Sequence, residues 1–104
     1  MKNDFICLGS KNATYRLICL HGWGADVTDL VPFGEELLKL LDIEVQLLFL
    51  NAPEFHPDGN GRQWYRLFPA DWSKIPNAIQ NLQDRLIKHS SSSIPLSNTF
   101  LLGF

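Results

Sequence analysis

Residues 15–24 run Tyr-Arg-Leu-Ile-Cys-Leu-His-Gly-Trp-Gly, and this stretch decides the fold. Its first six residues are almost continuously apolar, which is typical of a strand that is covered on both faces of a sheet. The run ends abruptly at His21, and the glycines on either side of Trp23 allow a tight turn and a close approach to a ligand. Ligands bind at the carboxyl ends of parallel strands. The stretch therefore predicts a buried strand that leads into a functional turn, with an ordinary glycine-rich turn braced by His21 as the alternative.

The rest of the chain alternates between strand and helix patterns. Further strands are expected at residues 4–8, 43–50 and 99–104. Three- and four-residue spacing of apolar side chains predicts helices over residues 28–41 and 74–89. The positions that define these helices are Leu30, Phe33, Leu37 and Leu41 in the first, and Ile75, Ala78, Ile79, Leu82, Leu86 and Ile87 in the second. This order predicts an α/β fold with a mostly parallel sheet and helices on both faces, within a single domain over residues 1–104.

Polar residues ahead of each helix are expected to cap it, Thr28 or Asp29 for the first and Ser73 for the second. Gly34 slightly weakens the prediction of the first helix. Residues 51–72 are expected to be irregular, because the cluster of turn formers at 56–61 breaks any regular pattern. A loop of this length is usually functional or disordered, and its many aromatic residues argue against disorder.

The composition indicates one small globular domain. The chain has 104 residues, a hydrophobic content of 45% and a net charge of -2. With a sequence pI of about 5.8 and its basic residues scattered singly, it lacks the basic face of a nucleic-acid-binding protein. No nucleic-acid partner is therefore expected.

Two cysteines, Cys7 and Cys19, each lie in an apolar run and are expected to be buried, reduced thiols. A disulfide would require their two strands to lie side by side. Neither the cysteines nor the three histidines have the spacing of metal ligands, so no metal and no cofactor is expected. The start of the chain, at Met1–Asp4, lacks the basic segment and apolar run of a signal peptide. No apolar run approaches the ~20 residues that span a bilayer, so the expected location is the cytoplasm.

The last strand pattern ends in Gly103-Phe104. A nucleophile elbow has the sequence G-x-S-x-G between a strand and a helix, and Gly103-Phe104 corresponds to its first half. An apolar strand with no polar tail leaves an exposed edge, which is a hazard for a finished domain. The chain is therefore expected to be the N-terminal part of a longer domain, truncated at the nucleophile strand. The alternative is that Phe104 is a true C-terminus tucked into a core.

Four motifs in order resemble the phospholipase/carboxylesterase family of serine α/β-hydrolases, whose best-known branch is the acyl-protein thioesterases. The resemblance covers nearly the whole chain from about Tyr15. The motifs are His21-Gly22-Trp23-Gly24, Leu50-Asn51-Ala52-Pro53-Glu54, Gly61-Arg62-Gln63-Trp64-Tyr65 and Thr99-Phe100-Leu101-Leu102-Gly103-Phe104. The resemblance implies a hydrolase of carboxylic esters or acyl thioesters that uses a Ser, Asp/Glu and His triad. In this fold the triad follows that chain order, so all three residues would lie beyond Phe104. The 104-residue chain alone is then expected to be inactive.

The resemblance also implies roles for residues that are present. The backbone N–H of Trp23 would contribute to an oxyanion hole, while Gly22 and Gly24 shape the turn and His21 holds it by hydrogen bonds. Trp64 and Tyr65 would wall the substrate groove, with a plain core anchor as the alternative for Trp64. The adjoining pair Arg62-Gln63 is expected to consist of solvated loop residues.

Other functions stay open at this point. The H-G-W-G sequence also occurs in other α/β-hydrolases, including acyl-carrier-protein methyl-ester esterases and dienelactone-hydrolase-like enzymes. A non-catalytic module that binds a ligand on the same scaffold is a second class, because one fold hosts many functions. A nucleotide-binding α/β domain finds no support, since the chain has no G-x-G-x-x-G or Walker sequence.

Overall fold

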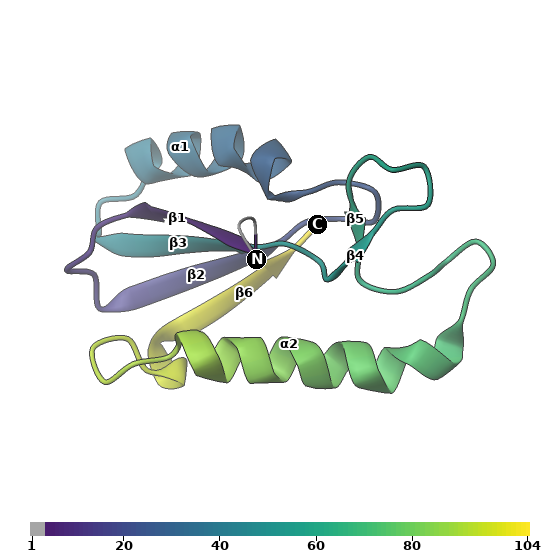
Figure 1. Cartoon of the computed structure of the whole chain (residues 1–104). Helices are drawn as coiled ribbons and strands as arrows, with labels where there is room; N and C mark the ends of the chain where they lie inside the picture. Colours follow the sequence, from purple (N-terminus) through teal and green to yellow (C-terminus); the bar gives the residue numbers. More distant parts are fainter. Residues whose placement is uncertain (1–3) are drawn as a thin grey trace.

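The computed structural model describes residues 4–104 and is built around a four-stranded sheet (Figure 1). Its strands are β1 (Phe5–Gly9), β2 (Tyr15–Leu20), β3 (Val45–Leu50) and β6 (Thr99–Gly103), in the spatial order β1-β3-β2-β6. β2 is parallel to both β3 and β6, whereas β1 is antiparallel to β3. The predicted α/β fold is confirmed, with a mixed sheet. The expectation about a signal peptide rests in part on Met1–Asn3, which lie outside the described residues.

Two helices cover opposite faces of the sheet, as Figure 1 shows for α1 (Val31–Leu40) above it and α2 (Ile75–His89) below it. Each follows a short 3₁₀ turn, η1 (Val27–Leu30) before α1 and η2 (Trp72–Lys74) before α2. A third 3₁₀ turn, η3 (Leu96–Asn98), leads into β6. No helix within residues 4–104 has both the length and the hydropathy that crossing a bilayer requires.

The predicted helix caps are wrong. The N-cap of η1 is Asp26, whose side chain accepts from the backbone N–H of Thr28 while Asp29 reaches back to the N–H of Asp26. Ser73 does not cap α2, because the intervening turn η2 places Lys74 at the N-cap position with no side-chain bond. In both cases a 3₁₀ turn precedes the helix. Its hydrogen bonds satisfy some of the backbone N–H groups that would otherwise need a capping side chain.

The core has two sides because the central strand β3 is covered on both faces. On the α1 side the buried cluster consists of Cys19, Val27, Leu30, Val45, Leu47 and Phe49. On the α2 side it consists of Ile18, Leu48 and Leu50, against which Leu82 and Leu86 of α2 pack. The apolar runs of β2 and β3 are nearly continuous because both faces of the sheet are covered. Successive side chains point in turn into one buried cluster and then into the other.

Some residues expected in the core lie at its margins. Cys7 is exposed because β1 is an edge strand and its side chain lies on the face opposite Ile6 and Leu8, which pack toward α1. Ile79 of α2 is also exposed, since it lines a pocket instead of the core. Both thiols are free, and burial raises the pKa of Cys19 to about 11.

The segment 51–72 is more regular than expected. It forms a small hairpin in which β4 (Glu54–Phe55) pairs antiparallel with β5 (Arg62–Gln63). Figure 1 shows this hairpin beyond the carboxyl ends of β2 and β3, beside the turn that follows β2. The hairpin thus lies at the edge of the sheet where the functional turn was predicted.

Candidate functional site

The turn after β2 and the end of β6 meet at one edge of the sheet. β2 and β6 are parallel neighbours, with Leu20 opposite Gly103. The N–H of Phe104 donates to the carbonyl oxygen of Leu20 at 3.0 Å. A Cβ added to Gly22 would lie 3.3 Å from the carbonyl oxygen of Phe104, so the two segments are in close contact. Two motifs about eighty positions apart in the chain therefore share one site.

His21 is fully buried behind the turn and uses both of its ring nitrogens. Nδ1 lies 2.8 Å from the carbonyl oxygen of Gly22, and Nε2 accepts the N–H of Ala52 at 2.9 Å. Because Nε2 accepts, Nδ1 carries the proton and donates to Gly22. Burial lowers the pKa of His21, although its bond to Gly22 and the carboxylates of Asp26 and Asp29 act in the opposite direction. The ring is thus a neutral link between the turn after β2 and the segment after β3.

The turn itself is fixed by backbone bonds on both sides of Trp23. Ala25 N–H donates to the carbonyl of Gly22 at 3.1 Å, and Gly24, at a φ of +85°, donates to the carbonyl of Arg62 at 2.8 Å. In return, Arg62 N–H donates to the carbonyl of Ala25 at 2.7 Å. Within residues 4–104 the backbone N–H of Trp23 donates to no protein acceptor. The Trp23 N–H is therefore an unused donor in the turn that follows β2.

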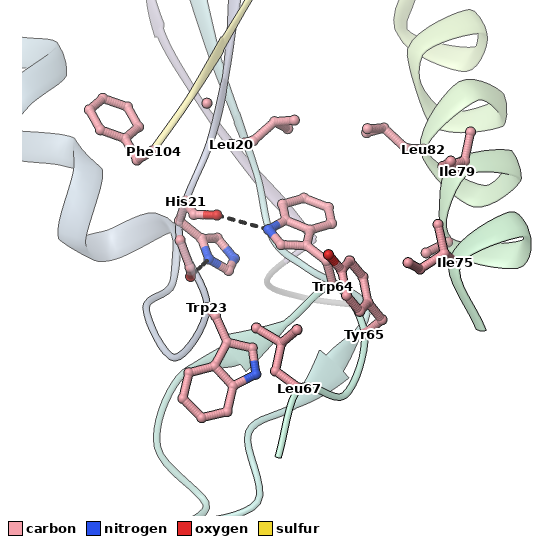
Figure 2. A pocket seen from close by; sticks show the side chains of 13 residues that line it. Leu20, His21, Trp23, Trp64, Tyr65, Leu67, Ile75, Ile79, Leu82 and Phe104 are labelled. Carbon is pink, nitrogen blue, oxygen red and sulfur yellow. Dashed lines mark hydrogen bonds between the residues drawn. The ribbon is translucent and has the colours of Figure 1, made fainter. Parts of the chain in front are cut away.

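Trp64 contacts both the turn and the core. Its Nε1 donates to the carbonyl oxygen of His21 at 2.8 Å, and the two rings lie with centroids 5.2 Å apart. The indole also packs against the buried cluster on the α2 side, which includes Leu50. Figure 2 shows the Trp64 ring between the turn and α2, with its hydrogen bond to His21 drawn as a dashed line. Pocket wall and core anchor, the two roles considered for Trp64, are therefore combined in one side chain.

A pocket of about 370 Å³ opens between the turn, the end of β6 and the first half of α2 (Figure 2). Most of its surface is apolar. The residues that line it are Leu20, His21, Gly22, Trp23, Trp64, Tyr65, Leu67, Ile75, Ala78, Ile79, Leu82, Gly103 and Phe104. The structure thus brings together every site residue named from the sequence except Gly24, which supports the turn from outside the pocket.

No group of three or more His, Cys, Asp or Glu side chains is arranged to hold a metal ion within residues 4–104. The lining residues carry backbone N–H and carbonyl groups, the Tyr65 hydroxyl and the His21 ring, whereas the indole N–H groups of Trp23 and Trp64 already donate to Gln63 and His21. Such a set can hydrogen-bond a neutral or anionic oxygen, and the apolar walls can hold a hydrocarbon group.

A scan of protein-family models gives no match to this chain, and a search of curated proteins gives none. Among solved structures, the chain is similar to the one titled "Crystal structure of esterase PE8", with a TM-score of 0.75 and 20% sequence identity. The fold is therefore similar to that of this esterase. The match covers 98% of this chain and 52% of the PE8 chain, so this chain spans about half the length of its neighbour.

Two residues that contact the turn after β2 were placed wrongly from the sequence. Arg62 and Gln63 are buried, at 6% and 2% exposure, and are not solvated loop residues. The side chain of Arg62 donates to the carbonyl of Ala52 at 3.2 Å and its guanidinium lies 4.2 Å above the Phe55 ring. Gln63 accepts from Nε1 of Trp23 at 3.0 Å. No local sequence signal indicates this burial, because it arises from contact with the turn after β2.

Proposed function

We propose that this chain is part of a serine hydrolase of carboxylic esters or acyl thioesters, of the phospholipase/carboxylesterase type. The observation that supports the proposal is the unused N–H of Trp23 in the turn that follows β2, whose last residue, Leu20, pairs with Gly103 of the parallel strand β6. In α/β-hydrolases the nucleophile follows such a strand, and the oxyanion hole combines an N–H from a neighbouring strand's loop with that of the residue after the nucleophile.

In the proposed reaction, a serine that follows Phe104 in the full-length protein attacks the substrate carbonyl. A histidine takes the serine proton and then gives it to the departing alcohol or thiol. Water then hydrolyses the acyl-enzyme by the same route. The N–H of Trp23 donates to the oxyanion that forms in each tetrahedral intermediate, where a fixed donor in a dry site is most effective.

The catalytic histidine is proposed to lie beyond Phe104. Both ring nitrogens of His21 are already occupied, by the carbonyl of Gly22 and the N–H of Ala52. A general base needs a free lone pair that faces the nucleophile. His21 therefore acts in the proposal as a support for the turn, together with Gly22 and Gly24.

The apolar pocket is proposed to hold the acyl group or the leaving group. Trp64 and Tyr65 form one wall and Ile75 and Ile79 of α2 another, around about 370 Å³. The reaction needs no cofactor and no metal ion. Trp23 is also among the lining residues, and its bulk is proposed to limit the space next to the reacting carbonyl.

The test uses the product of the complete reading frame. A fluorophosphonate probe should label a serine encoded directly after Phe104, and p-nitrophenyl esters or acyl thioesters should be hydrolysed. Replacement of that serine by alanine should abolish both signals. A glycine or alanine encoded at that position, or binding of acyl esters without turnover, would contradict the proposal and favour a non-catalytic binding module.

A further inference from the structure

The side chain of Trp23 is held by a segment that the proposed reaction does not use. Its Nε1 donates to Oε1 of Gln63 at 3.0 Å. Gln63 lies on β5 and is 2% exposed, so its amide is fixed by the surrounding protein. A hydrogen bond to a buried, immobile acceptor orients an indole more strictly than one to solvent.

Two aromatic rings restrict the same indole. The Trp23 ring contacts His56 edge to face, with centroids 4.1 Å apart, and contacts Phe68 at 5.2 Å. His56 and Phe68 lie on either side of β5 in the chain, so the hairpin segment supplies the ring contacts as well as the hydrogen bond. Edge-to-face pairs of this kind have a preferred geometry, which limits rotation of the ring.

The residue next to Gln63 fixes the backbone of the same turn. Arg62 exchanges two backbone hydrogen bonds with the turn, from Gly24 N–H at 2.8 Å and to the carbonyl of Ala25 at 2.7 Å. Trp23 is therefore tied to β5 through its side chain and through the peptide that follows it. These two restraints leave its own N–H free and fix the direction in which that N–H points.

We infer that Gln63 is a positioning residue that sets the direction of the Trp23 backbone N–H through the Trp23 indole. This inference rests on the proposed function, in which that N–H stabilises the oxyanion. Loss of a whole oxyanion donor typically lowers kcat by about 10²–10³. Loss of the Gln63 bond leaves the donor in place but less well aimed, so a fall in kcat of about tenfold with KM unchanged is expected.

The experiment uses the full-length protein and the variants Gln63→Met, Trp23→Phe and their combination. Gln63→Met removes the acceptor at a similar side-chain length, and Trp23→Phe removes the donor while keeping an aromatic ring. Active sites are titrated with the fluorophosphonate probe in a separate sample, so that kcat is calculated from the concentration of enzyme with a reactive serine. Each single variant should lose about tenfold in kcat, and the double variant should lose little more, because both changes break one interaction.

Gln46→Met is the matched control. Its Oε1 accepts from Nε of Arg16 at 2.7 Å at the opposite end of the sheet, so the change also removes a partly buried side-chain bond. Its kcat should equal that of the wild type.

The inference is overturned if Gln63→Met keeps kcat within twofold, if KM alone changes, or if the two single losses multiply in the double variant. If Gln63→Met does not fold, a wild-type kcat in Trp23→Phe overturns it. A wild-type protein without hydrolysis overturns the proposed function and this inference together.

Discussion

Gly61 is a residue at which the hairpin closely approaches the turn. Its φ is +76°, and a Cβ at this position would lie 2.0 Å from the carbonyl oxygen of Gly24. Gly59 in the same hairpin has a similar φ of +83° but nothing within 4 Å of such a Cβ. The two glycines therefore separate the effect of backbone conformation from the effect of contact.

Alanine substitution at each glycine tests this separation. Gly59→Ala should lower the free energy of unfolding by about 1 kcal/mol, the cost of a left-handed conformation. Gly61→Ala should lower it by about 3 kcal/mol, because overlap with the Gly24 carbonyl adds to that cost. Urea unfolding of both variants measures the difference. Equal losses would show that a Cβ at position 61 does not clash with the carbonyl oxygen of Gly24.

The buried ring of His21 makes the protein sensitive to acid. Burial lowers its folded-state pKa below the ordinary value of 6.5, so the unfolded chain binds a proton more readily than the folded one. The free energy of unfolding should therefore be at its full value above about pH 6.5 and should fall as the pH is lowered through that region.

NMR titration of the His21 ring should give a midpoint below 6.5. His89 contributes with the same sign, since burial and the charges of Arg16, Arg85 and Lys88 lower its pKa. Stability is therefore compared in His21→Gln and His89→Gln, and each should lose part of the acid dependence. A His21 midpoint at or above 6.5 would contradict the neutral, doubly bonded ring.

The residues of the turn could be named from the sequence because glycines and a histidine after an apolar strand form a local pattern. The residues that form hydrogen bonds with the turn could not be identified in this way. Arg62 and Gln63 are polar residues next to a cluster of turn formers, which ordinarily places them in solvent. Their burial depends on a contact with residues 23–25 that no local pattern encodes.

At the scale of elements, Arg85 joins α2 to the rest of the chain in addition to the apolar face of the helix. Nη1 of Arg85 donates to the carbonyl oxygen of Asn51 at 2.7 Å, and its Nη2 donates to that of Asp4 at 3.1 Å. These bonds connect the helix to the segment after β3 and to the residue before β1. Burial lowers the pKa of Arg85, and the carboxylate of Asp4 partly offsets this.

Replacement of Arg85 by methionine should lower the free energy of unfolding by about 1–3 kcal/mol, because two carbonyl groups each lose a hydrogen bond from the guanidinium. Lys88→Met is the matched control, since Lys88 lies on the same helix and is exposed. It should change stability by no more than about 0.5 kcal/mol. Thermal and urea unfolding compare the two, and equal effects would show that Arg85 is not a structural link.

The helices and long strands were predictable because each has several turns or alternations of apolar residues. The small hairpin was missed because β4 and β5 have two residues each, too few for any periodicity.

Gly34 shows that helix propensity alone does not reveal why a residue is present. It weakens a helix by propensity, yet here it allows α1 to lie close to β3, since a Cβ there would be 2.4 Å from Cζ of Phe49.

At the scale of the whole molecule, the sheet edge formed by β6 is apolar, and no strand within residues 4–104 pairs with its outer side. β6 is an outer strand of the described sheet, and the side chains of Phe100, Leu101 and Phe104 are more than half exposed. An outer strand of this kind can pair with another chain, and apolar side chains strengthen that association.

Leu101→Lys should reduce self-association of the 104-residue chain. The charge opposes edge-to-edge pairing without touching the core, since Leu101 is 54% exposed. Leu40→Lys is the control, because Leu40 is 78% exposed on α1, away from the edge. Sedimentation velocity over a range of concentrations should show fewer oligomers only in Leu101→Lys. An equal decrease in both variants would point to net charge as the cause.

The close contact between Gly61 and Gly24 also sets a rule for redesign of the hairpin. Residues 57–60 lie at its tip, where Gly59 has free space, so insertions there lengthen the loop without moving its base. An insertion between Gly61 and Trp64 shifts the register of four hydrogen bonds to residues 21–25, which are the two of Arg62 and one each of Gln63 and Trp64. A grafted loop can therefore replace only the tip of the hairpin. Residues 61–64 at its base can be moved to another protein only together with residues 21–25.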